Sequence, residues 1–143
     1  MAKIKHIALS TPDPEKTAKF YADVFGMKQI GRVDNPNVSG YYLSDGEINL
    51  AVLNFKNDAV AGAERGKDYY GIHHIGFQVD SLPAITERLT AAGSARRDDV
   101  NDALGVGKSD HRYANVEVKY SGPDGIMLDV SETGWVGTSD FRP

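Results

Sequence analysis

The feature that most constrains the fold is an internal repeat, in which the second half of the chain echoes the first. Residues 4–11 read IKHIALST and residues 72–79 read IHHIGFQV, so His6 and His74 occupy equivalent places. The two histidines are 68 residues apart in a chain of 143 residues, which has the length of about one domain. Such a repeat predicts that one supersecondary unit is built twice.

A helix is predicted after each repeated segment. In the first half, Asp13 with the following proline is suited to begin a helix, and Gly26 is suited to end it. In the second half, Ser81 can cap a helix that ends at Gly93. The apolar positions at helical spacing are Ala18, Tyr21 and Phe25 in the first helix and Leu82, Ile85, Leu89 and Ala92 in the second.

Strand-like segments follow both predicted helices. They are residues 28–33, 40–44 and 47–53 in the first half, and a weak strand at 95–100 followed by 113–120 and 126–130 in the second. Each half therefore reads βαβββ, which predicts an α+β fold of two such modules in a single domain, 1–143. The first module spans about 3–53 and the second about 72–131, with a linker at 54–71 and a tail at 132–143 without regular pattern. The polar, glycine-bearing segment 98–112 is a candidate lid.

Alternation along the predicted strands separates an apolar face from a polar one. The apolar face is suited to packing under a helix. The polar face carries His6, Asn49, His74, Glu117 and Asp129. If the sheet curls, these side chains converge on one concavity.

Two imidazoles and a carboxylate that converge are typical of an open divalent metal site. Imidazole offers a lone pair at neutral pH, and the carboxylate offsets part of the metal charge. Positions left to water or substrate allow Lewis-acid chemistry. The sequence therefore indicates a metal site made by His6, His74 and Asp129.

Composition excludes several other classes of function. The chain has no cysteine, which excludes a disulfide scaffold, a thiolate metal site and a cysteine nucleophile. The net charge of −4 provides no broad basic surface for nucleic acid or for an anionic membrane. No apolar segment is long enough for a signal peptide or a membrane span, so we expect a cytoplasmic protein without nucleic-acid or membrane partners.

The sequence resembles the vicinal oxygen chelate superfamily over about residues 3–131. The segments that carry the resemblance are KHIALSTPDPEKTAKFYADVFGMK, GIHHIGFQVDSL and GPDGIMLDVSE. This superfamily includes glyoxalase I, methylmalonyl-CoA epimerase, extradiol ring-cleavage dioxygenases, and fosfomycin and bleomycin resistance proteins. The resemblance implies two βαβββ modules whose mixed sheets curl around a metal-centred cleft. By analogy it also implies a homodimer.

The resemblance also implies a ligand set for one divalent metal ion, with Fe, Mn, Ni, Co and Zn all compatible. The first-strand positions of the two modules are His6 and His74. The last-strand position of the second module, normally glutamate, is Asp129, and that of the first, glutamate or glutamine in glyoxalase I and the epimerase, is Asn49. His6, His74 and Asp129 form a two-histidine, one-carboxylate set like that of non-haem iron oxygenases.

Further polar residues are candidates for handling a substrate. Glu117 can act as a general base for a proton next to a carbonyl, and Tyr113 can orient a substrate or donate a hydrogen bond. Gln78, near His74, can orient a substrate in the same way. In the candidate lid, His111 and Arg112 can contact an anionic substrate.

These observations predict a metal-dependent enzyme acting on a small oxygen-bearing substrate. The metal ion would bind two adjacent substrate oxygens and stabilise an enediolate or related oxyanion. A lyase or isomerase, such as a glyoxalase-like or epimerase-like enzyme, is the leading interpretation. An extradiol-type dioxygenase using the three-ligand set is the alternative, and a non-catalytic ligand-binding resistance protein is a further one.

Overall fold

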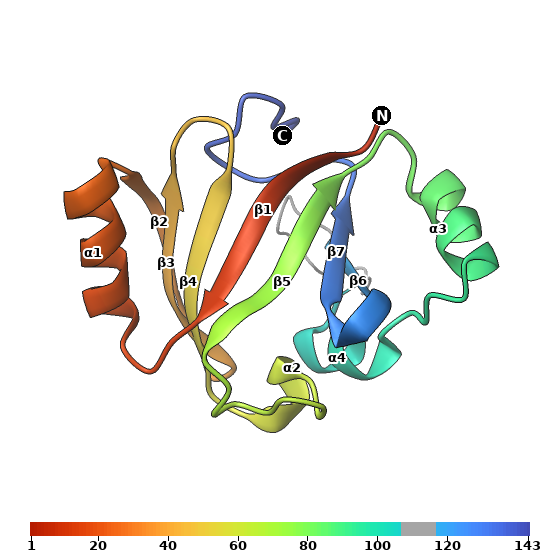
Figure 1. Cartoon of the computed structure of the whole chain (residues 1–143), viewed down its shortest axis with the longest axis horizontal. Coiled ribbons are helices and arrows are strands. Elements are labelled where there is room, and N and C mark those ends of the chain that lie inside the picture. Colours follow the sequence, from red (N-terminus) through yellow and green to blue (C-terminus); the bar gives the residue numbers. More distant parts are fainter. Residues whose placement is uncertain (107–116) are drawn as a thin grey trace.

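One curled sheet of seven strands forms the body of the molecule, with α1 and α3 at its two ends (Figure 1). A computed structural model describes residues 1–106 and 117–143. The strands are β1 (Lys3–Ser10), β2 (Lys28–Asp34), β3 (Val38–Ser44), β4 (Asn49–Phe55), β5 (Gly71–Gln78), β6 (Val118–Ser121) and β7 (Met127–Ser131). The helices are α1 (Pro14–Phe25), α2 (Asp58–Ala61), α3 (Leu82–Ala91) and α4 (Asp98–Leu104), with a 3₁₀ turn at Pro123–Gly125.

The two halves of the chain meet at β1 and β5, which pair antiparallel in the middle of the sheet. Each of these strands pairs on its other side, in parallel, with the last strand of its own half. The strand order is therefore β2-β3-β4-β1-β5-β7-β6. The α+β fold that the repeat predicts and the curled mixed sheet that the resemblance implies are both confirmed.

Both central strands carry a bulge directly before the repeated histidine. The register between β1 and β5 shifts between Ile4 and His6 on β1, and again where Ile72 and His74 lie on β5. The residues passed over are Lys5 and His73, and both side chains are buried. A bulge bends a strand and re-aims its side chains, so the repeat extends to the irregularities that flank His6 and His74.

Helix α1 forms where the sequence predicts it and covers one face of β3 and β4. The Asp13 side chain accepts a hydrogen bond from the backbone N–H of Lys16 at 3.1 Å, which caps the helix. Gly26 ends the helix with φ +72°, a conformation that favours glycine. Ala18 of α1 packs against a buried apolar cluster of Leu43, Leu50 and Val52.

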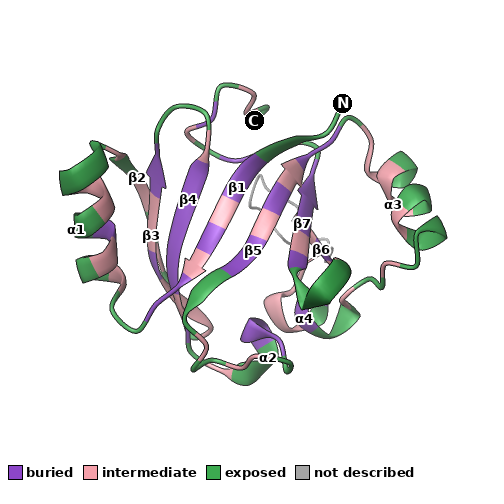
Figure 2. Ribbon diagram, in the orientation of Figure 1, coloured by how far each residue is buried: buried purple, intermediate pink, exposed green. Residues whose placement is uncertain are grey.

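The opposite face of the same strands is covered at one end by α2. There the small and apolar side chains of β1 and β4 meet Val60 and Ala61 of the helix. This second buried cluster contains Ala8, Ala51, Leu53 and Phe55. Strand β4 is consequently buried on both faces along nearly its whole length (Figure 2). The polar residues of this face lie beyond the apolar cluster, on the side away from α2.

Helix α3 begins and ends near the predicted residues. The Ser81 hydroxyl accepts a hydrogen bond from the backbone N–H of Ala84 at 3.2 Å, and Gly93 has φ +78° after the helix. Of the predicted apolar stripe, Leu82, Ile85 and Leu89 are half-buried and Ala92 is exposed, because α3 lies at the end of the sheet and packs against little of it. Thr86 of α3 makes a hydrogen bond of 3.0 Å with the Tyr120 hydroxyl of β6.

The strand predicted at residues 95–100 is wrong. Only an isolated bridge between Arg96 and Tyr120 forms, and helix α4 begins at Asp98. Asp98 and Asp99 lie in the first helical turn, where negative charge is favourable. The candidate lid at 98–112 is corrected in the same way, since its first residues, 98–104, are helical. The rest of that segment from residue 107 lies outside the described residues.

Helix α4 nevertheless replaces the missing strand at one point. The Asn101 side chain accepts from the backbone N–H of Lys119 at 2.9 Å and donates to its carbonyl oxygen at 3.3 Å. An amide side chain thus satisfies the edge of β6 as a neighbouring strand would. This contact holds the part of β6 that bears Lys119.

The residues after β7 cross the polar end of the sheet, on the side away from α2 (Figure 1). In the described parts of the chain, no helix is both long enough and apolar enough to cross a membrane.

Candidate metal centre

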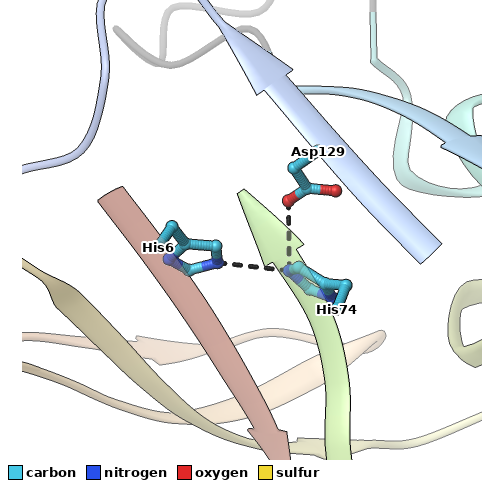
Figure 3. A group of neighbouring side chains, drawn as sticks. All are labelled: His6, His74 and Asp129. Carbon is cyan, nitrogen blue, oxygen red and sulfur yellow. Dashed lines mark hydrogen bonds and ion pairs between the residues drawn. The ribbon is translucent and has the colours of Figure 1, made fainter. Parts of the chain in front are cut away.

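His6, His74 and Asp129 converge from three neighbouring strands, β1, β5 and β7 (Figure 3). One potential ligand atom from each residue lies within 4.8 Å of the other two. Nε2 of His6 lies 3.1 Å from Nε2 of His74, which lies 3.0 Å from Oδ2 of Asp129. All three side chains are buried. The alternation of the predicted strands therefore placed these residues on the correct face.

The outer nitrogen of His6 is held by Asn49. Nδ1 of His6 lies 2.9 Å from Oδ1 of Asn49, and the Asn49 amide nitrogen donates to the carbonyl oxygen of Val136 at 3.0 Å. The second bond fixes the orientation of the amide, so Oδ1 is the acceptor and Nδ1 of His6 carries the hydrogen. Burial and the neighbouring His74 lower the pKa of His6 to about 3, so its ring is neutral and its Nε2 bears a lone pair.

The outer nitrogen of His74 is held by a second histidine. Nε2 of His73 lies 2.7 Å from the carbonyl oxygen of Ala61 and must donate to it. Burial lowers the pKa of His73 to about 4, so its Nδ1 bears a lone pair. That atom lies 2.8 Å from Nδ1 of His74, which is therefore the donor. The proton of a neutral His74 ring is thus on its outer nitrogen, as it is in His6.

The hydrogen bonds around the site thus turn Nε2 of both histidines toward each other and toward the Asp129 carboxylate. His6 therefore presents the lone pair of its Nε2, and Nε2 of His74 lies between that lone pair and the Asp129 carboxylate, where it carries a proton or binds a cation. Lone pairs at about 3 Å repel unless a proton or a metal cation lies among them. Outer hydrogen bonds of this kind orient imidazole ligands in metalloproteins. The donor set therefore fits a divalent cation.

Asp129 also has a cationic neighbour on its far side. Nζ of Lys119 lies 3.1 Å from Oδ1 of Asp129 and 3.8 Å from Glu117, and Lys119 is almost fully buried. Burial raises the pKa of Asp129, but His74 and Lys119 outweigh it and hold the pKa well below its usual range. The pKa of Lys119 is raised, because Asp129 and Glu117 outweigh the burial that lowers it. Both groups are therefore charged.

Glu117 precedes β6 and lies beside the carboxylate side of the site. Burial and the charge of Asp129 raise the pKa of Glu117 to about 8. Lys119 and the indole of Trp135 act in the opposite direction. A carboxyl group with a pKa near neutrality can exchange a proton with a bound substrate.

The other predicted site residues differ in where they lie. Gln78 is buried on the same face, and its amide nitrogen donates to the carbonyl oxygens of Glu132 and Asp140 at 3.2 and 2.7 Å. Gln78 thus holds the segment after β7, and its contact with a substrate stays a prediction. Tyr113, His111 and Arg112 lie outside the described residues.

Three residues of this site were missed by the sequence analysis as functional candidates. His73 was hidden because the repeat singles out only the second histidine of the pair. Lys119 lies in the strand predicted at 113–120 but was given no role. Trp135, whose ring stacks on His6, lies in a segment without periodicity. The only signal for it is a single tryptophan between Gly134 and Gly137.

Comparison with known proteins identifies the family. The sequence profile of the Glyoxalase/Bleomycin resistance protein/Dioxygenase superfamily matches residues 3–130. The mitochondrial methylmalonyl-CoA epimerase of Homo sapiens is 28% identical over 93 residues, which cover 62% of this chain and 53% of that protein. The match thus spans about half the length of the human relative.

Two further comparisons agree. The ethylmalonyl-CoA/methylmalonyl-CoA epimerase of Cereibacter sphaeroides is 28% identical over 98 residues, covering 66% of this chain and 73% of that protein. Among solved structures, a methylmalonyl-CoA epimerase in complex with methylmalonyl-CoA and NH4+ superposes with a TM-score of 0.71. That likeness covers 100% of this chain and 99% of the other at 18% identity, so it concerns the fold alone.

Proposed function

This chain belongs to the Glyoxalase/Bleomycin resistance protein/Dioxygenase superfamily, and we propose that it is a metal-dependent epimerase or isomerase. The observation that carries the proposal is the convergence of His6, His74 and Asp129 with their electron pairs turned inward. The reaction would move a proton on the carbon next to a carbonyl group of a small substrate. The names of the curated relatives support an acyl-CoA thioester as that substrate.

The proposed metal ligands are His6, His74 and Asp129. Asn49 would act through His6, because its oxygen already accepts the hydrogen on Nδ1 of that ring. When bound, a divalent ion polarises two adjacent substrate oxygens and so acidifies the neighbouring carbon. Three protein ligands leave coordination positions for those oxygens.

Glu117 is the proposed proton acceptor. Its carboxylate takes the proton from the carbon, so that the C–H bond breaks while an O–H bond forms, and the electron pair stays on the substrate. A proton delivered from solvent to the other face of the planar carbon inverts the centre, and Glu117 then releases the proton it took to solvent. Lys119, which faces both Glu117 and Asp129, would keep the two carboxyl groups from repelling an anionic intermediate.

The proposal is tested by hydrogen exchange at carbon. Protein loaded with Co²⁺ or Ni²⁺ is incubated with methylmalonyl-CoA in deuterium oxide, and deuterium in the substrate is measured by mass spectrometry. We expect exchange in the parent protein, and at least a 100-fold lower rate in Glu117→Gln, since general-base catalysis contributes about 10²–10⁴-fold. His74→Ala should lose both the metal and the exchange.

The outcome that would contradict the proposal is equally specific. A folded parent protein that binds no divalent metal ion by mass spectrometry rules out the metal-dependent reaction. Metal binding without exchange on any of several 2-substituted acyl thioesters rules out the epimerase. The matched control is Lys56→Ala, because Lys56 pairs with Asp34 on the exposed surface and should leave metal content and exchange unchanged.

One observation favours a second candidate, a ring-cleavage dioxygenase. Because Asn49 is engaged with His6, the proposed ligand set is two histidines and one carboxylate, which is the arrangement of non-haem iron oxygenases. Oxygen uptake by the Fe²⁺-loaded protein with catechols would support this candidate. Exchange of the substrate proton without oxygen uptake would support the epimerase.

A further inference from the structure

We propose that Trp135 is a positioning residue of the metal site, and that the segment 132–142 after β7 is the structure that holds it there. The segment is called the closing segment below. The inference rests on the proposed metal site, and it adds a determinant of metal binding that does not itself touch the metal ion. The role we assign to Trp135 is to fix the plane of the His6 imidazole.

The rings of Trp135 and His6 are stacked face to face. Their centroids lie 4.9 Å apart and their planes differ by 2°. Trp135 is one of the largest fully buried side chains in the described part of the protein, at 2% exposure. Asn49 holds the His6 ring at Nδ1 only, and a ring held at one atom can still swing about that contact. The flat indole removes this freedom and keeps Nε2 aimed at His74.

The sheet is shaped to receive the indole. Gly76 on β5 lies directly opposite His6 on β1 in the strand register. A Cβ atom at Gly76 would lie 2.7 Å from Cζ2 of Trp135 and 2.7 Å from Cβ of His6. Real contacts do not become so short, so any other residue at this position would displace Trp135 or His6. Because Gly76 has no side chain, β5 leaves space there for the stacked rings of Trp135 and His6.

The closing segment is tied to the sheet directly after Trp135. The Asn49 amide donates to the carbonyl oxygen of Val136 at 3.0 Å, and the Ser44 hydroxyl donates to that of Gly137 at 2.6 Å. Asn49 therefore holds His6 with its oxygen and the neighbour of Trp135 with its nitrogen. The same residue sets the position of both stacked rings.

Further along, the closing segment is held by charge. Nζ of Lys5 lies 2.7 Å from Asp140 and 2.9 Å from Glu47, and the Lys5 side chain is only 6% exposed. The Gln78 amide donates to the carbonyl oxygen of Asp140 at 2.7 Å. Lys5 precedes His6 and Gln78 follows His74 on their strands, so the strands that supply the histidines also anchor the segment.

The backbone on either side of Trp135 requires glycine. Gly134 has φ +79° and Gly137 has φ +85°, conformations that other residues rarely adopt. A Cβ atom at Gly134 would lie 2.4 Å from the side-chain oxygen of Gln78, and one at Gly137 would lie 2.5 Å from Ile30. Two turns thus direct a single side chain inward.

The test compares Trp135→Phe, which keeps a flat ring, with Trp135→Leu, which keeps apolar bulk without one. Affinity for Ni²⁺ is measured by calorimetry with a competing chelator, and the urea midpoint of each metal-free variant is measured alongside. We expect Phe to retain the affinity within about threefold and Leu to lower it roughly 10–100-fold, the range typical of residues that orient metal ligands. Equal affinity in the Leu variant and the parent would overturn the inference, and so would equal losses in both variants.

A second readout does not depend on metal. In the metal-free parent, nitrogen NMR of ring-labelled histidine should report one fixed tautomer for His6, with hydrogen on Nδ1. Trp135→Leu should give averaged signals for that ring, and Trp135→Phe should not. An unchanged His6 spectrum in Trp135→Leu overturns the inference even if the protein binds no metal. If the parent protein binds no metal ion but Trp135→Leu changes the His6 spectrum as expected, only the proposed function is overturned and the role of Trp135 stands.

Discussion

The Nε2 atoms of His6 and His74 lie 3.1 Å apart, and the hydrogen bonds on the far side of both rings occupy the other nitrogen of each. The Asn49 side-chain oxygen accepts a hydrogen bond from Nδ1 of His6, and Nδ1 of His73 accepts one from Nδ1 of His74. With Oδ2 of Asp129 at 3.0 Å from His74, the three residues offer two ring nitrogens and a carboxylate oxygen to one cation. The consequences of this relationship can be measured with the protein alone.

The first prediction is that a divalent metal ion stabilises the fold. An ion bound only by the folded state adds RT ln(1 + [L]/Kd), which is about 2.7 kcal/mol at a free concentration of 100 Kd. Thermal unfolding with and without Zn²⁺ or Ni²⁺ should therefore show a clear rise in Tm. His74→Ala and Asp129→Ala should abolish the rise, and the same rise in all three proteins would place the bound ion elsewhere.

The second prediction concerns the amide that links His6 to the closing segment. Asn49→Leu removes the acceptor for Nδ1 of His6 and the donor to Val136, so metal affinity should fall roughly 10–100-fold, as for other outer-sphere partners of imidazole ligands. Asn49→Asp keeps the acceptor and loses only the donor. It should therefore retain more metal affinity in calorimetry than the Leu variant. If Asn49→Leu binds metal like the parent, Asn49 does not orient His6.

Much of this site could be predicted because its residues follow two regular patterns, the internal repeat of the chain and the alternation of side chains along a strand. The repeat places His6 and His74 at equivalent points, and alternation along a strand decides which face each side chain takes. In the strand register, Asn49 on β4 pairs directly with His6 on β1, and Asp129 on β7 pairs with Gly76 on β5. These contacts follow from register, which a sequence with a clear apolar face specifies strongly.

The parts that could not be predicted depend on contacts between distant segments. The strand expected at 95–100 is a bridge and a helix, and Arg97 just before the helix pairs bidentately with Glu64, 33 residues earlier. The position of Trp135 depends on the empty space above Gly76 and on turns at two glycines. Neither leaves a periodic signal in the sequence. The role of His73 depends on the carbonyl oxygen of Ala61, which only the folded chain brings near.

The third prediction is that Lys119→Met separates stability from metal binding. Loss of the ammonium 3.1 Å from the buried Asp129 leaves that charge poorly compensated, so the metal-free protein should lose about 3–5 kcal/mol of unfolding free energy. Removing a positive charge beside the site should also increase metal affinity, so added Ni²⁺ should raise Tm more than in the parent. Lys56→Met is the surface control. A smaller metal-induced rise in Lys119→Met would contradict this account.

The fourth prediction is an acid sensitivity of the metal-free fold that involves His73. Its pKa is lowered from 6.5 to about 4, so between these values the unfolded chain binds a proton that the folded protein does not. Stability is therefore fully present above pH 6.5 and falls as the pH decreases toward 4, by about 2 kcal/mol between pH 7 and 5 for this one group. Urea unfolding at the two pH values gives the difference.

The matched variant for this measurement is His73→Gln, which has no group that titrates in this range. The difference in unfolding free energy between pH 7 and 5 should be smaller in the variant than in the parent by about 2 kcal/mol. The absolute stability of the variant does not matter, since each protein is compared with itself. Equal pH dependence in both proteins would mean that His73 takes up its proton equally in the folded and unfolded states.

The fifth prediction uses the single tryptophan as a reporter. In Gly76→Ala, the added Cβ would lie 2.7 Å from both Trp135 and His6, so one ring must move away from the other. We expect Trp135 emission to shift to longer wavelength as the indole meets water, and Ni²⁺ to bind more weakly and to quench it less. Gly31→Ala on β2, where a Cβ meets only Tyr42 at 3.2 Å, is the control and should keep the parent spectrum. Unchanged emission and quenching in Gly76→Ala would show that the space above β5 does not hold the stack, and that the indole and His6 are positioned by other contacts.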